Sequence, residues 1–202
     1  MIGSKIGHRL DPVLLSLYRS FFGRRCASPN AISLTGTIFG FLAAYLIFIE
    51  RPAFGAIFFL IAGFFDIMDG AVARGSNRVT RFGGFFDSVL DRYTDMSIMG
   101  AICFVYIRHN TIGLALATFI AIIGTALIPY ARARAEAASV DCKTGILERP
   151  ERTVLLVIGL FIPVTLNYII VILAILTHIT VIQRIVHGWK KTGNSPPPSP
   201  RT

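Results

Sequence analysis

Charged residues are scarce in this chain: Asp, Glu, Lys and Arg make up 15% of its 202 residues, whereas hydrophobic residues make up 53%. Cysteine is scarcer still. Cys26, Cys103 and Cys142 are far apart and form no CxxC pair, which argues against a disulfide framework and against a zinc site. A cleavable signal is not expected either, because five Lys and Arg residues are spread through residues 1–25. The composition excludes an ordinary soluble domain and predicts a single membrane domain.

Six hydrophobic segments account for this composition, at about 31–49, 53–73, 84–107, 112–131, 153–164 and 166–186. A helix that crosses a bilayer needs about 20 apolar residues, and the first four segments meet that length. Pro163 and Asn167 divide the last two, because proline interrupts a helix. The sequence therefore predicts an all-α integral membrane protein, with a six-transmembrane-helix bundle over residues 28–190.

The two ends of the chain differ from this bundle. Residues 1–27 combine basic residues with apolar ones at helical spacing from Leu10 to Phe21, which predicts an N-terminal juxtamembrane amphipathic helix in the headgroup plane. A helix that packs within the bundle is the alternative. Residues 191–202 contain four prolines, so a disordered tail is expected there.

The net charge of +9 is distributed unevenly along the six segments. Of the 20 Lys and Arg residues, all but Arg51, Arg92 and Arg108 fall at the termini or in the loops on one side of the bundle. The positive-inside rule then predicts a multi-pass protein of the cell membrane with both termini and the active site in the cytoplasm. Anionic headgroups of the lipid bilayer and phosphorylated substrates are the expected partners, and nucleic acid is not.

Aspartates are the exception to the apolar pattern. Asp66 and Asp69 share one helix face, and Asp87 and Asp91 share a face of the next helix, so four carboxylates are expected to converge across the short loop between them. Carboxylates inside a membrane protein are costly and usually functional. Oxygen ligands without His or Cys suit Mg²⁺ or Mn²⁺, and two such ions could clamp a phosphoryl group. Arg74, one turn after Gly70, could neutralise a phosphate.

Two other classes of membrane protein use aspartates. A divalent-cation transporter would need polar residues in the middle of several spans, which the first, fourth, fifth and sixth segments essentially lack. An intramembrane prenyltransferase would need a second aspartate motif, and beyond Asp95 the chain holds just Asp141. Both remain lesser alternatives.

The pattern Asp-x2-Asp-Gly-x2-Ala-Arg-x8-Gly-x3-Asp-x3-Asp, from Asp66 to Asp91, resembles the signature of the CDP-alcohol phosphatidyltransferase family. This resemblance implies an enzyme in which an acceptor hydroxyl attacks the β-phosphate of CDP-diacylglycerol, or of an ether-lipid analogue, and CMP leaves. It implies that Asp66, Asp69 and Asp87 bind the two metal ions, and that Asp91 binds the second ion and acts as general base. It also implies a homodimer, and it places the following residues at the CDP-lipid: Asn30, Ala31, Ile32, Ser33, Asp66, Gly70, Arg74 and Thr80.

Later segments narrow the resemblance. Residues 130–136 and 148–152, together with Gln183-Arg184, look like the matching stretches of phosphatidylinositol phosphate synthases and their archaetidyl counterparts. A cluster of guanidinium groups suits a phosphorylated acceptor, and the candidates are Arg132, Arg134, Arg149, Arg152 and Arg184. Membrane anchoring and Arg–Glu pairs are the other reading of these arginines. Inositol 1-phosphate is the first choice of acceptor. Glycerol 3-phosphate, which would make the chain a phosphatidylglycerophosphate synthase, is the alternative.

Overall fold

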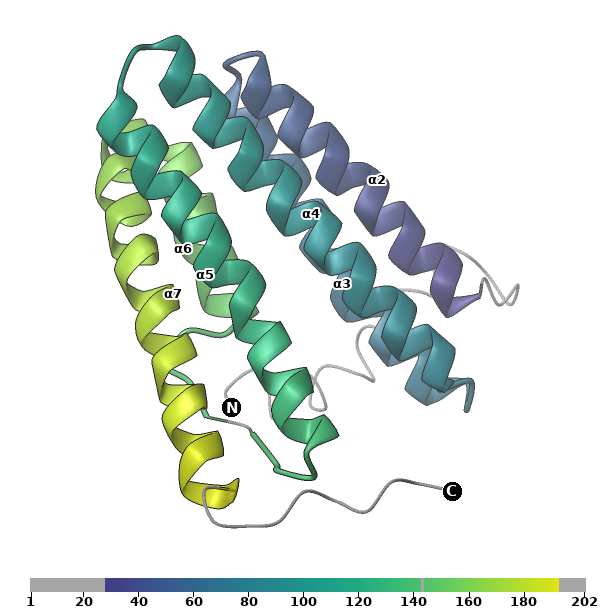
Figure 1. Cartoon of the computed structure of the whole chain (residues 1–202). Helices are drawn as coiled ribbons and strands as arrows, with labels where there is room; N and C mark the ends of the chain where they lie inside the picture. The colour runs from purple at the N-terminus through teal and green to yellow at the C-terminus, as the bar shows by residue number, and fades with distance from the viewer. Residues whose placement is uncertain (1–27, 143, 193–202) are drawn as a thin grey trace.

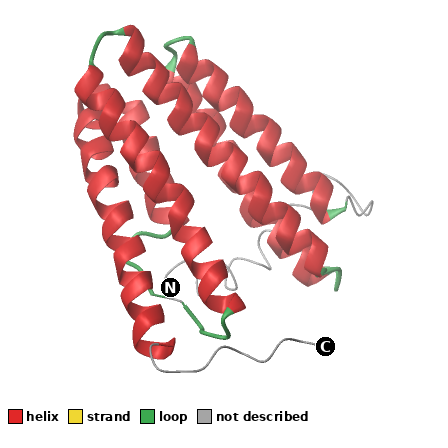
Figure 2. Ribbon diagram, viewed as in Figure 1, coloured by secondary structure: helices red, strands yellow, loops and turns green. Residues whose placement is uncertain are grey.

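In the computed structural model the described residues, 28–142 and 144–192, form a bundle of helices with no β-strand among them (Figures 1 and 2). The helices are α2 Pro29–Phe48, α3 Pro52–Gly75, α4 Arg81–Arg108, α5 Ile112–Ala137, α6 Arg149–Phe161 and α7 Pro163–Thr192. The all-α prediction is confirmed. The predicted amphipathic helix over 1–27 and the predicted tail from residue 193 onward lie outside the described residues.

Local sequence signals explain where several helices begin. The Ser28 hydroxyl accepts a hydrogen bond from the Ala31 amide at 3.2 Å and caps α2. Thr80 caps α4 in the same way, because its hydroxyl accepts from the Gly83 amide at 2.9 Å. The predicted break near Pro163 is present, since α6 ends at Phe161 and α7 begins at this proline.

Short left-handed turns make the first helices antiparallel. Glu50, Asn77 and Asn110 have φ near +60°, and each is the second residue after the end of α2, α3 or α4. As a result the start of α2, the α3–α4 turn, the end of α5 and the end of α7 lie at one end of the bundle, the lower end in Figure 1, and α6 begins higher up, beside the middle of α7. This end is called the site end below.

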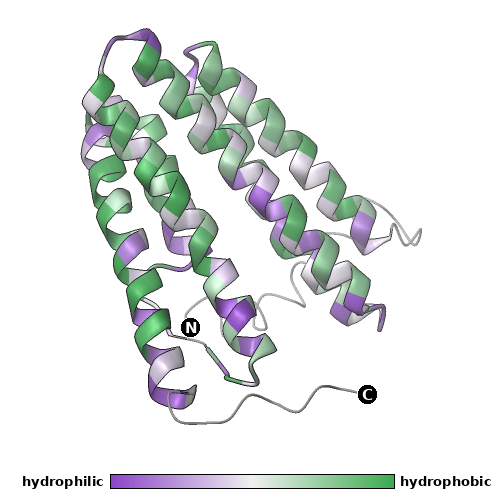
Figure 3. Ribbon diagram, in the orientation of Figure 1, coloured by the Kyte–Doolittle hydropathy of each residue, from purple (hydrophilic) through white to green (hydrophobic). Residues whose placement is uncertain are grey.

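The core lies around α4, which packs against α2 on one side and α5 on the other. Its fully buried side chains Ile98 and Ile102 belong to the same cluster as Leu160 of α6 and Ile170 of α7. Apolar residues also cover much of the outer surface, whereas polar residues gather along α4 and toward the site end (Figure 3). An apolar exterior of this kind is stable in lipid and costly in water.

Within residues 28–142 and 144–192, four helices are long and apolar enough to cross a membrane: α2, α3, α5 and the Pro163–Lys191 part of α7. The protein is therefore a membrane protein. α4 carries three aspartates, Asp87, Asp91 and Asp95, and α6 is only 13 residues long.

Candidate active site

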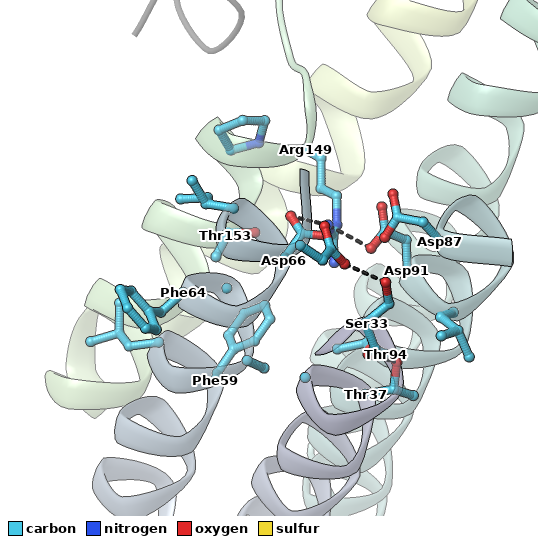
Figure 4. Close-up of a pocket in the computed structure, with 18 of the residues that line it drawn as sticks. Ser33, Thr37, Phe59, Phe64, Asp66, Asp87, Asp91, Thr94, Arg149 and Thr153 are labelled. Atoms are coloured by element: carbon cyan, nitrogen blue, oxygen red, sulfur yellow. Dashed lines mark hydrogen bonds and ion pairs between the residues drawn. The ribbon is translucent and has the colours of Figure 1, made fainter. Parts of the chain in front are cut away.

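Three carboxylates meet at the site end between α3 and α4. One carboxylate oxygen from each of Asp66, Asp87 and Asp91 lies within 4.8 Å of the other two (Figure 4). Asp66 comes from the second half of α3, and the other two come from successive turns in the first half of α4. The short α3–α4 turn thus brings together three of the four aspartates singled out in the sequence.

The fourth aspartate is held by α2. Asp69 is buried, with 6% of its surface exposed, and its Oδ2 accepts a hydrogen bond from the Ser33 hydroxyl. Its negative charge is repelled by the charges of Asp66 and Asp87, so it lies within electrostatic reach of the cluster. Ser33 was predicted to contact the nucleotide, and in the structure it orients this carboxylate.

A guanidinium group lies directly against the carboxylates. Arg149 is the first residue of α6, and its Nη1 is 2.8 Å from Asp66 Oδ2 and 2.7 Å from Asp91 Oδ1. These two ion pairs are drawn in Figure 4. Arg149 was predicted to bind the acceptor phosphate, and in the structure it is paired with two of the aspartates.

Asp95 lies outside the motif, and its place on the aspartate stripe predicts a supporting or structural role beside the site. It follows Asp91 by four residues, so helical periodicity puts it on the same face of α4, one turn deeper in the bundle. Its Oδ2 is 3.1 Å from Arg152 Nη2, and its Oδ1 is 3.4 Å from Arg149 Nε. The four-residue spacing from Asp91 indicated the helix face on which Asp95 lies, but the sequence did not indicate its partners on α6. Arg92 was passed over, and its Nη1 is 3.5 Å from Asp91 Oδ2.

The predicted nucleotide residues lie around the start of α2 and the two glycines of the motif. A Cβ added to Gly70 would lie 3.0 Å from Arg74 Nη1, so the guanidinium of Arg74 lies over this glycine. A Cβ added to Gly83 would lie 3.3 Å from Asn30 Oδ1, so any larger residue would crowd the start of α2. The motif glycines therefore allow two polar side chains to approach the backbone.

The other predicted nucleotide residues have different surroundings. Ala31 is exposed, whereas Ile32 is buried against Met68 and Val72, so its side chain faces the core. The Thr80 hydroxyl already caps α4. A nucleotide could reach Ile32 through its backbone and not through its side chain.

The five predicted acceptor arginines separate into two groups. Arg149 and Arg152 are joined to the aspartates by the contacts above. Arg132 pairs with Glu136 at 2.8 Å within α5, and Arg134 is exposed on the same helix. Arg184 is buried, and donates to two backbone carbonyls: Ile128 at 2.5 Å and Thr144 at 2.9 Å. These contacts make Arg184 a link between α5, α7 and the segment before α6.

A cavity of about 350 Å³ extends from the aspartates along α3 and α6 (Figure 4). Asp66, Asp91 and Arg149 line its charged part, and Phe59 and Phe64 line its apolar part. Such a cavity can take an amphiphilic molecule with a charged head and an apolar tail.

The donor set fits a divalent cation. It consists of carboxylate oxygens, which are the ligands that Mg²⁺ and Mn²⁺ prefer, and it contains no thiolate or imidazole among the described residues near it. Carboxylates this close to one another also need positive charge between them. In the structure Arg149 supplies part of that charge.

Comparison with known proteins agrees with this geometry. A family model described as CDP-alcohol phosphatidyltransferase matches residues 26–183. An archaetidylinositol phosphate synthase of Pyrococcus horikoshii is 35% identical over 166 residues, which cover 81% of this chain and 85% of that protein. A phosphatidylinositol phosphate synthase of Mycolicibacterium smegmatis is 33% identical, with 78% of this chain and 76% of that protein covered.

Solved structures give the same picture. The crystal structure of Mycobacterium tuberculosis phosphatidylinositol phosphate synthase with CDP-DAG bound superposes with a TM-score of 0.78 and 28% identity. The match covers 89% of this chain and 92% of that one. The same enzyme in complex with manganese and citrate gives a TM-score of 0.79, with 89% and 88% covered.

Proposed function

This chain belongs to the CDP-alcohol phosphatidyltransferase family, and we propose that it transfers a phosphatidyl group from CDP-diacylglycerol to inositol 1-phosphate and releases CMP. One observation carries the proposal. The carboxylates of Asp66, Asp87 and Asp91 lie together with Arg149 in one part of a cavity, and the other part of that cavity is apolar. An ether-linked CDP-lipid is the alternative donor, supported by the similarity to archaetidylinositol phosphate synthases. Glycerol 3-phosphate is the alternative acceptor.

Four carboxylates would hold two divalent ions, Mg²⁺ or Mn²⁺: those of Asp66, Asp69, Asp87 and Asp91. Bound ions of this kind neutralise the charge of a pyrophosphate and polarise its phosphorus–oxygen bonds. The Ser33 hydroxyl donates to the Asp69 carboxylate, so the position of this proposed ligand depends on α2. The similarity to an enzyme crystallised with manganese supports the metal, and the choice between the two ions is part of the proposal.

The transfer needs a proton acceptor at the attacking hydroxyl, and Asp91 takes this role. The acceptor oxygen forms a bond to the β-phosphorus of the CDP-lipid while the bond from that phosphorus to the bridging oxygen breaks. The hydroxyl proton goes to the Asp91 carboxylate, and CMP carries away the bridging oxygen with its electron pair. Arg74 beside Gly70, with Asn30 at the start of α2, holds the nucleotide phosphates.

The acceptor phosphate needs guanidinium groups close to the aspartates. Arg149 and Arg152 lie one turn apart at the start of α6 and are the first candidates. Arg132, Arg134 and Arg184 complete the predicted basic cluster, although Arg184 is already bonded to two carbonyls. We expect Arg152→Ala to raise the KM of the acceptor far more than that of the donor.

The membrane arrangement follows from the same proposal. The six helices form the membrane bundle, in which α6 enters the bilayer only part of the way because its 13 residues are shorter than a full span. The site end faces the cytoplasm because it carries most of the basic residues. The chain forms a homodimer, and the protein resides in the cell membrane.

The test is CMP release by detergent-purified protein with CDP-diacylglycerol and Mg²⁺. Inositol 1-phosphate, glycerol 3-phosphate, free inositol and serine are offered separately. Release with inositol 1-phosphate is expected. Release with glycerol 3-phosphate alone would replace the acceptor and keep the reaction, and release with free inositol or serine would remove the phosphate-binding role of the arginines.

A further inference from the structure

Asp95 is a buried carboxylate that neither the family motif nor the proposed reaction uses. Just 6% of its surface is exposed, and it lies on the face of α4 that carries Asp87 and Asp91. Its two oxygens face two different arginines of α6: Oδ2 accepts from Arg152 Nη2 at 3.1 Å, and Oδ1 faces Arg149 Nε at 3.4 Å. One carboxylate therefore bridges both acceptor arginines.

The two arginines need such a bridge because they repel each other. They are three residues apart on α6, so their side chains leave the same face, and the positive charge of Arg149 acts against that of Arg152. Arg152 is 5% exposed, and water can screen this repulsion only weakly at a buried site. A carboxylate between the two guanidinium groups keeps both at the site end of α6.

The contacts with Asp95 also determine which N–H donors of the two arginines remain for other partners. Asp95 engages Nε of Arg149 and Nη2 of Arg152, whereas Nη1 of Arg149 points to Asp66 and Asp91. A guanidinium has five N–H donors in a fixed plane, so holding one edge fixes the direction of the other. Arg149 thus spans from Asp95 to the reacting end of the site.

Stability alone does not explain this arrangement. Taking a carboxylate and a guanidinium out of water costs several kcal/mol per ion in general, and well-packed apolar side chains of similar size are often as stable or more stable. A buried bridge that is continuous with a substrate site has a further use, namely to fix the direction of groups that bind the substrate.

We propose that Asp95 is a positioning residue for the acceptor: it holds Arg149 and Arg152 as a pair that binds the phosphate of the phosphorylated polyol. The inference rests on the proposed function. Asp95 itself touches neither the donor nor the reacting phosphorus, and it acts through the two arginines.

Asp95→Asn is the test, because it keeps the shape of the side chain and removes its charge. The acceptor KM is expected to rise about tenfold to hundredfold, the range seen when a partner that orients a binding group is lost. The donor KM is expected to stay within about twofold of wild type. Inositol 1-phosphate should raise the Tm of the wild-type protein, and this rise should disappear in Asp95→Asn.

A double-mutant cycle separates positioning from general damage. If Asp95 acts through its arginines, Asp95→Asn should raise the acceptor KM less in an Arg152→Gln background than in wild type. Glu50→Gln is the matched control, because Glu50 pairs with Arg108 and His109 at 3.3 Å at the opposite end of the bundle. Both KM values should be unchanged in that control.

Three outcomes would overturn the inference: equal changes in donor and acceptor KM, no change in either, or an undiminished effect in the Arg152→Gln background. If Asp95→Asn alone does not fold, the acceptor KM of Arg152→Gln is compared with that of the double variant Asp95→Asn/Arg152→Gln. The double variant should fold, because it buries neither the Asp95 charge nor the Arg152 charge. A further rise in acceptor KM in the double variant is then expected through Arg149, and its absence would refute the role.

The proposed function fails in a different way. Wild-type protein that shows neither CMP release nor a Tm rise with inositol 1-phosphate or glycerol 3-phosphate would remove the phosphorylated acceptor, and Asp95 would lose its proposed role with it. If the wild-type protein responds to glycerol 3-phosphate alone, that compound is the acceptor. The double-mutant cycle of Asp95 and Arg152 would then be measured with glycerol 3-phosphate.

Discussion

Arg149 and a divalent cation need the same carboxylate oxygens, and replacing Arg149 should therefore strengthen metal binding. Nη1 of Arg149 lies 2.8 Å from Asp66 and 2.7 Å from Asp91, and both carboxylates belong to the group that could hold an ion. A cation that binds there must displace the guanidinium from at least one of them. Arg149→Gln removes this competitor and also removes a positive charge that repels the ion.

The size of the effect follows from the bonds that are lost. A hydrogen bond to a charged group contributes about 1.5–3 kcal/mol, and the displaced guanidinium recovers part of this by its remaining contact with Asp95 and with water. The side chains of Arg149 and Asp66 are 23% and 32% exposed, so solvent weakens the pair further. Counting about one bond, we expect the Kd for Mn²⁺ to fall about tenfold to hundredfold.

The assay is the titration of purified protein with Mn²⁺ in the absence of substrates, with free Mn²⁺ followed by electron paramagnetic resonance. Arg108→Gln is the control, since Arg108 pairs with Glu50 at the other end of the bundle. The metal-free Arg149→Gln protein should also melt at a lower temperature than wild type and gain more from added Mn²⁺. An unchanged or weaker affinity for Mn²⁺ would refute the competition.

Three further substitutions test other parts of the site and the bundle. Asp91→Asn should bind the CDP-lipid with near wild-type affinity and lose turnover, measured by lipid binding and CMP release on the same preparation. Ser33→Ala leaves the buried Asp69 carboxylate without the hydroxyl that donates to it, and should lower the free energy of unfolding by about 1–3 kcal/mol, measured by denaturation in detergent. Gly159→Ala should lower the Tm, because the new Cβ would lie 2.8 Å from Leu166 Cδ1 and 3.1 Å from its Cα.

Matched variants show what would contradict these predictions. Robust turnover by Asp91→Asn would remove Asp91 as the proton acceptor. Ser33→Thr keeps a hydroxyl and should recover part of the stability that Ser33→Ala loses. Gly100→Ala is the control for Gly159→Ala, because a Cβ there has no atom within 4 Å and alanine favours a helix over glycine. Equal melting shifts at the two glycines would mean that close packing between α6 and α7 is not the cause.

The sequence was informative wherever a short stretch of chain decides the geometry. Helical periodicity placed Asp66 on one face of α3 and Asp87 and Asp91 on one face of α4, and the short turn between these helices leaves few ways to join them. Pro163 marked the break before α7 for an equally local reason. These features need no knowledge of distant contacts.

The positions and partners of the arginine side chains depend on contacts between residues far apart in the chain, and for these the sequence was less informative. Nothing near Arg149 in the chain indicates that α6 packs against α3 and carries its guanidinium to Asp66. Nor does the local sequence show that Arg184 is buried against the carbonyls of Ile128 and Thr144. A charge at a helix end looks alike in sequence whether it anchors the membrane, pairs with a carboxylate or binds a substrate.

The position of α6 is the feature that joins the acidic half of the site to its basic half. Arg149 is the first residue of this helix, and the Glu148 amide donates to the Glu151 side chain at 3.1 Å, so the local capping fixes where the helix begins. A slip of the helix register by one residue would turn the guanidinium by about 100° around the helix axis and away from Asp66 and Asp91. The capping residues thus help to set the direction in which Arg149 enters the site. Their loss should disturb metal and acceptor binding together, because the same arginine takes part in both.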